Sequence, residues 1–308
     1  VDNETAAACY LNPVENKPKK RSHKELIYPF GCNSSQKTAV AQAFEHQISV
    51  IQGPPGTGKT QTILNIIANI IRQGKTAIVV SNNNSATANV LEKLEKYGIG
   101  FIAAPLGNKD NKTAFIANQP AIPDECRMWE LEIRASFQIE QRMRNTSQHL
   151  DKVYALQNER ALLLQEQHAI GLEWKHFCQD NDVDENTVSK HHINSKRIIS
   201  IWLNCQTRAD GEYTEPTHWI GKWIERIKWW WLQWTCINRM HVQNKIDKND
   251  LTALILELQT LYYLNRIREI SQRLEVINKE MASHDAKALA KNLSEDSMLL
   301  LKSSLHDH

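Results

Sequence analysis

The run from Gly53 to Thr60 constrains this chain more than any other feature. It reads Gly-Pro-Pro-Gly-Thr-Gly-Lys-Thr and matches the G-x-x-x-x-G-K-[ST] pattern of phosphate-binding loops. The apolar run 48–51 before it predicts a short buried strand, and apolar residues over 61–71 recur at helical spacing. Glycines at the start of a helix let backbone N–H groups converge on anionic oxygens, and the helix dipole adds positive potential there. The stretch therefore predicts a nucleoside triphosphate as ligand.

Two side chains of this run are expected to act on the ligand directly. We expect Lys59 to reach the outer phosphates as a point charge and the Thr60 hydroxyl to hold Mg²⁺, so ATP and Mg²⁺ are the expected cofactors. The residues predicted to form the nucleotide site are Gln36, Gly53, Pro54, Pro55, Gly56, Thr57, Gly58, Lys59, Thr60 and Gln61.

Gln36 lies in the first turn of a helix that Ser34 or Ser35 is expected to cap. A carboxamide at this place can pair with an adenine edge through one donor and one acceptor. The ordinary alternative is a polar surface residue at a helix start. Its position ahead of the phosphate-binding run favours the first interpretation.

Composition sets bounds on the class of protein. A length of 308 residues suggests two domains or one domain with a large insertion, and a formal charge of +2 does not by itself indicate a nucleic-acid partner. We find no signal peptide and no apolar run approaching the roughly 20 residues of a spanning helix, so no membrane partner is expected. Widely spaced cysteines indicate reduced thiols and a cytoplasmic location; they are Cys9, Cys32, Cys126, Cys178, Cys205 and Cys236.

The order of motifs resembles a known family. Asn33-x-x-Gln36, then Ala39-Val40, then the run 53–60 resemble superfamily 1 helicases, and in particular their branch of AAA-type P-loop ATPases that moves 5′ to 3′ along DNA or RNA. The resemblance covers roughly residues 27–120. It implies that Gln36 reads adenine and that the fold is α/β, a partial P-loop (RecA-like) motor domain.

A third motif supports this resemblance. Residues 76–80 predict a strand, and 81–94 run from a turn into a helix; together they resemble motif Ia, which touches the nucleic-acid backbone in the family. The resemblance implies Asn83 and Asn84 as nucleic-acid contacts, although Asn82 and Ala88 depart from the motif. The plain alternative is a turn with a helix N-cap. Residues 98–104 predict a further strand.

The later part of the chain predicts long helices. Apolar periodicity indicates one helix from 127 to about 169, broken near Gly171, and another over 250–283. We expect them to pair as an antiparallel stalk or coiled coil inserted into the motor domain, with a protein partner on the stalk as an option. The rival interpretation is an intermolecular coiled coil that forms a dimer.

A tryptophan-rich insert, residues 171–249, lies between these helices. Its basic aromatic pattern could stack single-stranded bases or lie on a membrane surface, but a small helical core is the favoured interpretation. A zinc site is not favoured, because the spacing fits no recognised finger. The residues concerned are Trp219, Trp223, Trp229, Trp230, Trp231 and Trp234 for the pattern, and His168, His176, Cys178, His191, His192 and Cys205 for the metal.

The sequence offers no convincing catalytic carboxylate pair of the motif II type. Asp124-Glu125 follows a proline-broken segment, and Asp184-Glu185 follows a polar stretch. No catalytic residue is therefore assigned, and we expect the chain by itself to bind ATP without turnover.

These observations predict a leading segment 1–26, a nucleotide-binding portion 27–125, a helical insertion 126–285, and a return segment 286–308 that stops before motif II. The chain would be an N-terminal portion of a superfamily 1 helicase-like ATPase. In the whole protein, ATP hydrolysis would drive translocation on or unwinding of nucleic acid, and the rest of the helicase core would be a partner. The alternative is a non-catalytic nucleotide-binding module whose stalk mediates protein–protein interaction.

Overall fold

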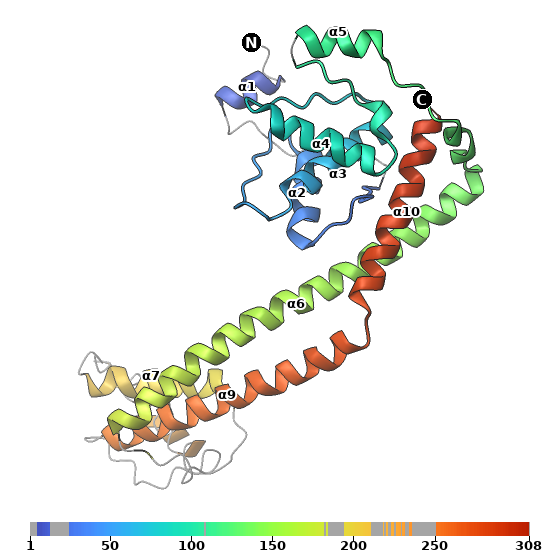
Figure 1. Cartoon of the computed structure of the whole chain (residues 1–308). Helices are drawn as coiled ribbons and strands as arrows, with labels where there is room; N and C mark the ends of the chain where they lie inside the picture. Colours follow the sequence, from blue (N-terminus) through green and yellow to red (C-terminus); the bar gives the residue numbers. More distant parts are fainter. Residues whose placement is uncertain are drawn as a thin grey trace. The chain divides into compact units, whose positions relative to one another are not determined.

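The protein forms two compact units, residues 1–155 with 284–308 and residues 156–283 (Figure 1). The computed structural model describes residues 5–12, 25–107, 109–181, 183, 194–210, 218, 220, 223–224, 226–228, 230–231, 234–235 and 251–307. Their helices are α1 (Ala6–Leu11), α2 (Ser34–Glu45), α3 (Lys59–Arg72), α4 (Asn84–Lys96), η2 (Gly100–Ile102), α5 (Lys109–Ala117), η3 (Asp124–Trp129), α6 (Ile133–Asn181), α7 (Ser195–Ala209), α9 (Thr252–Ala282) and α10 (Ala286–His306).

The predicted α/β fold is wrong for the described part of the chain, which contains helices and no β-strand. Residues 49–52 and 75–80 have no regular secondary structure and are exposed, with Val50 79% and Ile78 89% accessible, whereas 98–104 contains the short 3₁₀ helix η2. A strand is stable only where a neighbour bonds its backbone N–H and C=O groups. None of the described segments bonds to these two runs in that way, so their apolar residues do not enter a sheet.

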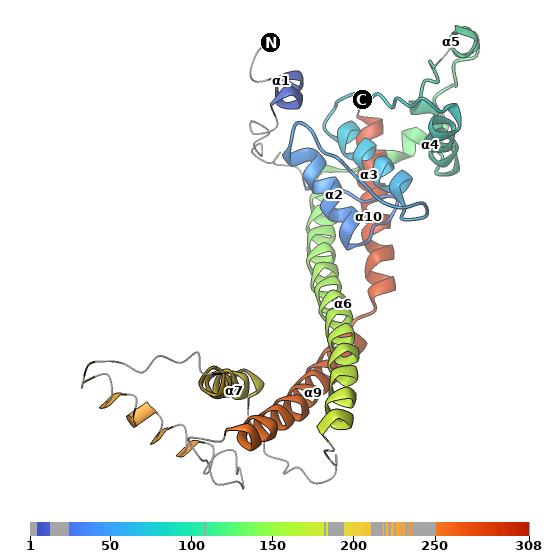
Figure 2. The same cartoon turned by 90° about the vertical axis from the view of Figure 1, so that its left-hand side faces the viewer.

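Helix α3 is the centre of the first unit. Helices α2, α4 and α10 all contact it (Figure 2). Its Leu64 and Ala68 are both 1% accessible and join one apolar core with residues of α2, α4, α6 and α10. The helix that begins at the phosphate-binding run is therefore held on several sides.

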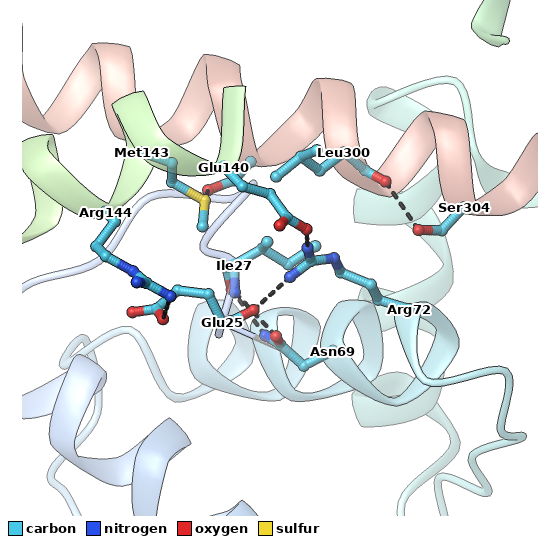
Figure 3. Close-up of polar contacts among 10 residues, drawn as sticks. Glu25, Ile27, Asn69, Arg72, Glu140, Met143, Arg144, Leu300 and Ser304 are labelled. Carbon is cyan, nitrogen blue, oxygen red and sulfur yellow. Dashed lines mark hydrogen bonds and ion pairs between the residues drawn. The ribbon is translucent and has the colours of Figure 1, made fainter. Parts of the chain in front are cut away.

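One face of α3 is polar and buried. Asn65, Asn69 and Arg72 lie at helical spacing on it, and each bonds the backbone of segment 25–31, which ends in a turn. Asn69 accepts from Ile27 N (2.9 Å) and donates to Ile27 O (2.7 Å). Figure 3 shows Asn69 facing Ile27, and Arg72 between the Glu25 carbonyl and Glu140.

Helix α10 bonds the same segment. Ser297 Oγ accepts from Tyr28 N at 2.9 Å, and Ser294 Oγ donates to Pro29 O at 2.7 Å. Side chains from α3 and α10 thus satisfy backbone groups of 25–31 that a neighbouring strand would otherwise satisfy. This arrangement connects α10, late in the sequence, to the helix that begins at the phosphate-binding run.

The second unit contains the end of α6 together with α7 and α9. Helix α9 runs beside this part of α6 in both views (Figures 1 and 2). Arg273 Nε and Nη2 bond both Glu159 carboxylate oxygens at 2.7 and 2.8 Å, and Arg266 pairs with Glu166 at 2.5 Å. The unit also contains two apolar clusters; their buried members are Ile170, Ile270 and Leu274, and Ile198, Ile201, Cys205, Leu251, Leu254, Leu258 and Leu261.

The expected end of the first long helix near Gly171 is wrong. Helix α6 continues through Gly171 to Asn181, because one helix glycine costs only about 1 kcal/mol and neighbouring turns outweigh it. Trp174 of the insert is buried and Trp202 packs against an apolar cluster, whereas four other described tryptophans are 43–63% exposed; they are Trp223, Trp230, Trp231 and Trp234. The small helical core therefore stays a prediction for these four. Trp219 and Trp229 lie outside the described residues.

A carboxylate of α9 holds the start of α7. Glu269 accepts from Ser195 N (2.8 Å) and Ser195 Oγ (2.6 Å), and Arg266 donates to it at 3.3 Å. Partial burial raises the pKa of Glu269, but these hydrogen bonds outweigh burial and leave the pKa below its ordinary value of 4.5. A carboxylate with a lowered pKa stabilises the fold above its unfolded pKa and loses that effect as pH falls through the folded value.

We expect Glu269→Ala to lower the free energy of unfolding at neutral pH by about 1 kcal/mol, the usual value of a helix N-cap interaction. The difference from wild type should shrink as pH falls below 4.5. Thermal unfolding across a pH series measures this, with the exposed Glu280→Ala of the same helix as control. A difference that stays constant into acid would contradict the role of the charge.

Candidate nucleotide site

The phosphate-binding run forms an exposed loop that leads directly into α3. Gly56 and Gly58 have φ of 83° and 79°, a backbone region that residues with a Cβ rarely adopt. At Gly53, an added Cβ would lie 2.7 Å from the Thr57 hydroxyl oxygen. This backbone path therefore requires glycine at 56 and 58, and at 53 an added Cβ would force the Thr57 side chain to move. The predicted strand–loop–helix order is correct for the loop and the helix.

Lys59 folds back over the loop from the first turn of α3. Its ammonium donates to Gly53 O (2.7 Å) and Pro54 O (2.8 Å). An ammonium carries three N–H donors, so one remains for an anion at the mouth of the loop. Thr60 follows in the same turn and is half-buried, and the unbonded N–H groups of that turn give the site positive potential.

Gln36 lies behind the loop and is only 6% exposed. Its Oε1 accepts from Asn33 N at 2.8 Å, because Asn33, and not the predicted Ser34 or Ser35, caps α2 and forms a capping box with Gln36. Its Nε2 lies 3.2 Å from both Gly58 O and Gln61 Oε1. Both ends of the amide are bonded, so pairing with adenine would require an exchange of partners, and that role stays a prediction.

The predicted nucleic-acid contacts lie at the start of α4. Asn83 is its N-cap and accepts from Ser85 N (3.0 Å) and Ser85 Oγ (2.8 Å), and Asn84 is the first helical residue. Both asparagines are exposed. The turn-and-cap interpretation therefore describes Asn83 correctly, and a role in nucleic-acid binding is compatible with the exposure.

The described acidic pair, Asp124-Glu125, does not lie at the end of a strand. Asp124 and Glu125 are exposed on η3, where Asp124 faces Arg127 at 4.0 Å, and Asp184-Glu185 lies outside the described residues. Within the described ranges, no group of three or more His, Cys, Asp and Glu side chains could hold a metal ion; His191 and His192 are not among them. No helix of the described residues has the length and apolar character needed to span a bilayer.

Reasoning from sequence missed three features that shape the site. Gly31 has φ 75°, and an added Cβ there would lie 3.1 Å from Gln61 Nε2. The buried amides Asn65 and Asn69 anchor α3 to segment 25–31. Two asparagines at i and i+4 on the inner face of an otherwise isoleucine-rich helix were the available signal, since buried amides need partners.

A glycine-containing loop that leads into a helix N-terminus is the arrangement typical of phosphate-binding loops. A family profile described as "AAA domain" matches residues 31–299. That match extends over far more than half of the chain, so the chain belongs to this AAA domain family.

Relatives with curated names match short stretches of this chain. The DNA polymerase alpha-associated DNA helicase A of Schizosaccharomyces pombe is 38% identical over 71 residues, 23% of this chain and 11% of that protein. The putative ATP-dependent RNA helicase ECM32 of Saccharomyces cerevisiae is 44% identical over 64 residues, which are 20% of this chain and 6% of that protein. Regulator of nonsense transcripts 1 of Caenorhabditis elegans is 40% identical over 71 residues, which are 23% of this chain and 7% of that protein. No solved structure matches the chain.

These findings confirm the resemblance to superfamily 1 helicases and place the chain in a helicase-like ATPase family. The matched region spans 11% or less of each of the three relatives. The activities of these whole relatives are therefore only proposed for this chain, in the next section.

Proposed function

We propose that this chain is the nucleotide-binding part of a superfamily 1 helicase-like ATPase and that it binds ATP with Mg²⁺ at residues 53–60. The observation that carries the proposal is the loop geometry: two left-handed glycines, a lysine over the loop and a helix N-terminus together form an anion cradle. In the whole protein, ATP hydrolysis would drive movement along DNA or RNA.

The division of labour belongs to the same proposal. Residues 27–125 carry the nucleotide, and the helical insertion 126–285 serves as a stalk to which a protein partner can dock. Asn83 and Asn84 contact the nucleic-acid backbone, because exposed groups at a helix N-terminus favour anionic oxygens. Single-stranded DNA and RNA are both candidate partners.

Titration of the protein with ATP in the presence and absence of Mg²⁺ tests the nucleotide site. We expect saturable binding that weakens at least about tenfold when the metal is chelated, because Mg²⁺ neutralises phosphate charge. Thr60→Ala should remove most of this Mg²⁺ dependence, since the hydroxyl is the proposed metal ligand. Thr113→Ala, which deletes an exposed hydroxyl on α5, is the matched control. Equal affinity with and without metal in the wild type would contradict the proposal.

A further inference from the structure

We propose that Gln36 bonds the phosphate-binding loop on the side away from the ligand, so that the loop's backbone N–H groups point toward the phosphates. Gln61 orients the Gln36 amide for this role. We name this pair of side chains the amide latch. The inference rests on the proposed nucleotide site and assigns Gln36 a positioning role toward phosphate, which is distinct from reading the base.

The contacts place the latch on the loop itself. Gln36 Nε2 lies 3.2 Å from Gly58 O and 3.4 Å from Thr57 O, two successive carbonyls at the end of the loop. Gly58 O also accepts the first helical bond of α3, from Thr62 N at 3.1 Å. The latch therefore bonds the loop at the point where the loop leads into α3.

The geometry of the peptide unit determines where the backbone N–H groups of the loop point. In a trans peptide unit the C=O and the N–H point in opposite directions. Because the carbonyls of Thr57 and Gly58 face Gln36, the N–H groups of Gly58 and Lys59 in the same peptide units face the opposite side, where an anion binds at the helix N-terminus. Fixing two donors before the ligand arrives lowers the ordering cost of binding.

Gln61 determines which way round the Gln36 amide lies. Gln61 Nε2 donates to Phe30 O, so its Oε1 is the atom that faces Gln36 Nε2, at 3.2 Å. The other end of the Gln36 amide is bonded by Asn33 N at 2.8 Å. A reversed Gln36 amide would oppose oxygen to oxygen at Gly58 and at Gln61, which these bonds prevent.

The glycines beside the latch leave it room. A Cβ at Gly58 would lie 2.2 Å from Gln36 Nε2 and 3.3 Å from Gln61 Oε1, and one at Gly31 would lie 3.1 Å from Gln61 Nε2. The motif glycine at 58 is thus required both by its φ and by the latch. Since the latch bonds the loop, Phe30 O and Asn33 N of this chain, its effect does not depend on the base, and the latch treats all triphosphates alike.

The test compares three probes: Mg²⁺-ATP, Mg²⁺-GTP and Mg²⁺-tripolyphosphate, which has no base. We expect Gln36→Ala and Gln61→Leu each to weaken all three by a similar factor of about five to ten, which is what one net hydrogen bond supports. Combining them should add little to the larger single effect, because the two side chains act as one unit. Faster motion of the Gly58 and Lys59 amides in ¹⁵N relaxation of the ligand-free variants is the second readout.

Thr38→Ala is the matched control, because it deletes an exposed side-chain hydrogen bond of α2, to Ser34 O, that takes no part in the latch. It should leave affinity for the three probes within about twofold. Loss of ATP affinity alone, with tripolyphosphate unchanged, would make Gln36 a base reader and overturn the inference. Unchanged mobility of the two amides would also overturn it. Absence of wild-type binding to every probe would instead refute the proposed function.

Discussion

Lys59→Ala should weaken Mg²⁺-ATP binding by about 10- to 100-fold, the factor expected for loss of a hydrogen bond to a charged group. The ammonium bridges Gly53 O and Pro54 O and keeps a third donor for phosphate. Its removal deletes a positive charge and also releases the first half of the loop from the helix. Calorimetric titration of the purified variant measures the loss.

The exposed Lys75→Ala, just beyond the other end of α3, is the control for loss of one positive charge and should leave affinity within about twofold. Lys59→Arg distinguishes charge from shape, because a planar guanidinium cannot reproduce the compact bridge of an ammonium. We expect Lys59→Arg to recover only part of the affinity. Wild-type affinity in Lys59→Ala would show that triphosphates do not bind at this loop.

The site could be predicted from the sequence to the extent that its determinants are local. Gly56, Gly58, Lys59 and Thr60 belong to one loop and one helix turn, and a single continuous motif specifies them. The orientation of Gln36 could not be predicted, because it depends on Gln61, which is distant from Gln36 in sequence but beside it in the fold.

The fold class was wrong because pairing of strands is not local information. The apolar runs around Val50 and Val79 indicate strands, but neither run forms regular secondary structure. Whether such a run becomes a strand depends on a partner elsewhere, and no described segment of this chain supplies one. Long helices were easier to predict, as α9 shows, since their periodicity lies within one segment.

The second large effect is expected on stability, at the buried asparagines Asn65 and Asn69 of α3, which we call the side-chain ladder. Asn69→Ala should lower the free energy of unfolding by about 2–5 kcal/mol. Asn69 is 2% exposed and bonds both backbone groups of Ile27, which is itself fully buried. The substitution leaves that N–H and that C=O without Asn69 in an environment that water does not reach, and each unsatisfied group costs about 1–3 kcal/mol.

The loss should spread beyond the side chain removed. Segment 25–31 is bonded at Ile27 by Asn69, at Phe30 N by Asn65 and at Tyr28 N by Ser297. Weakening the first bond therefore loosens the connection between α3 and α10. Urea denaturation followed by far-ultraviolet circular dichroism measures the change, with the exposed Asn89→Ala of α4 as control. Because alanine is the better helix former, that control should be neutral or slightly stabilising. If Asn69→Ala behaved like Asn89→Ala, the side-chain ladder would not be what holds segment 25–31 against α3.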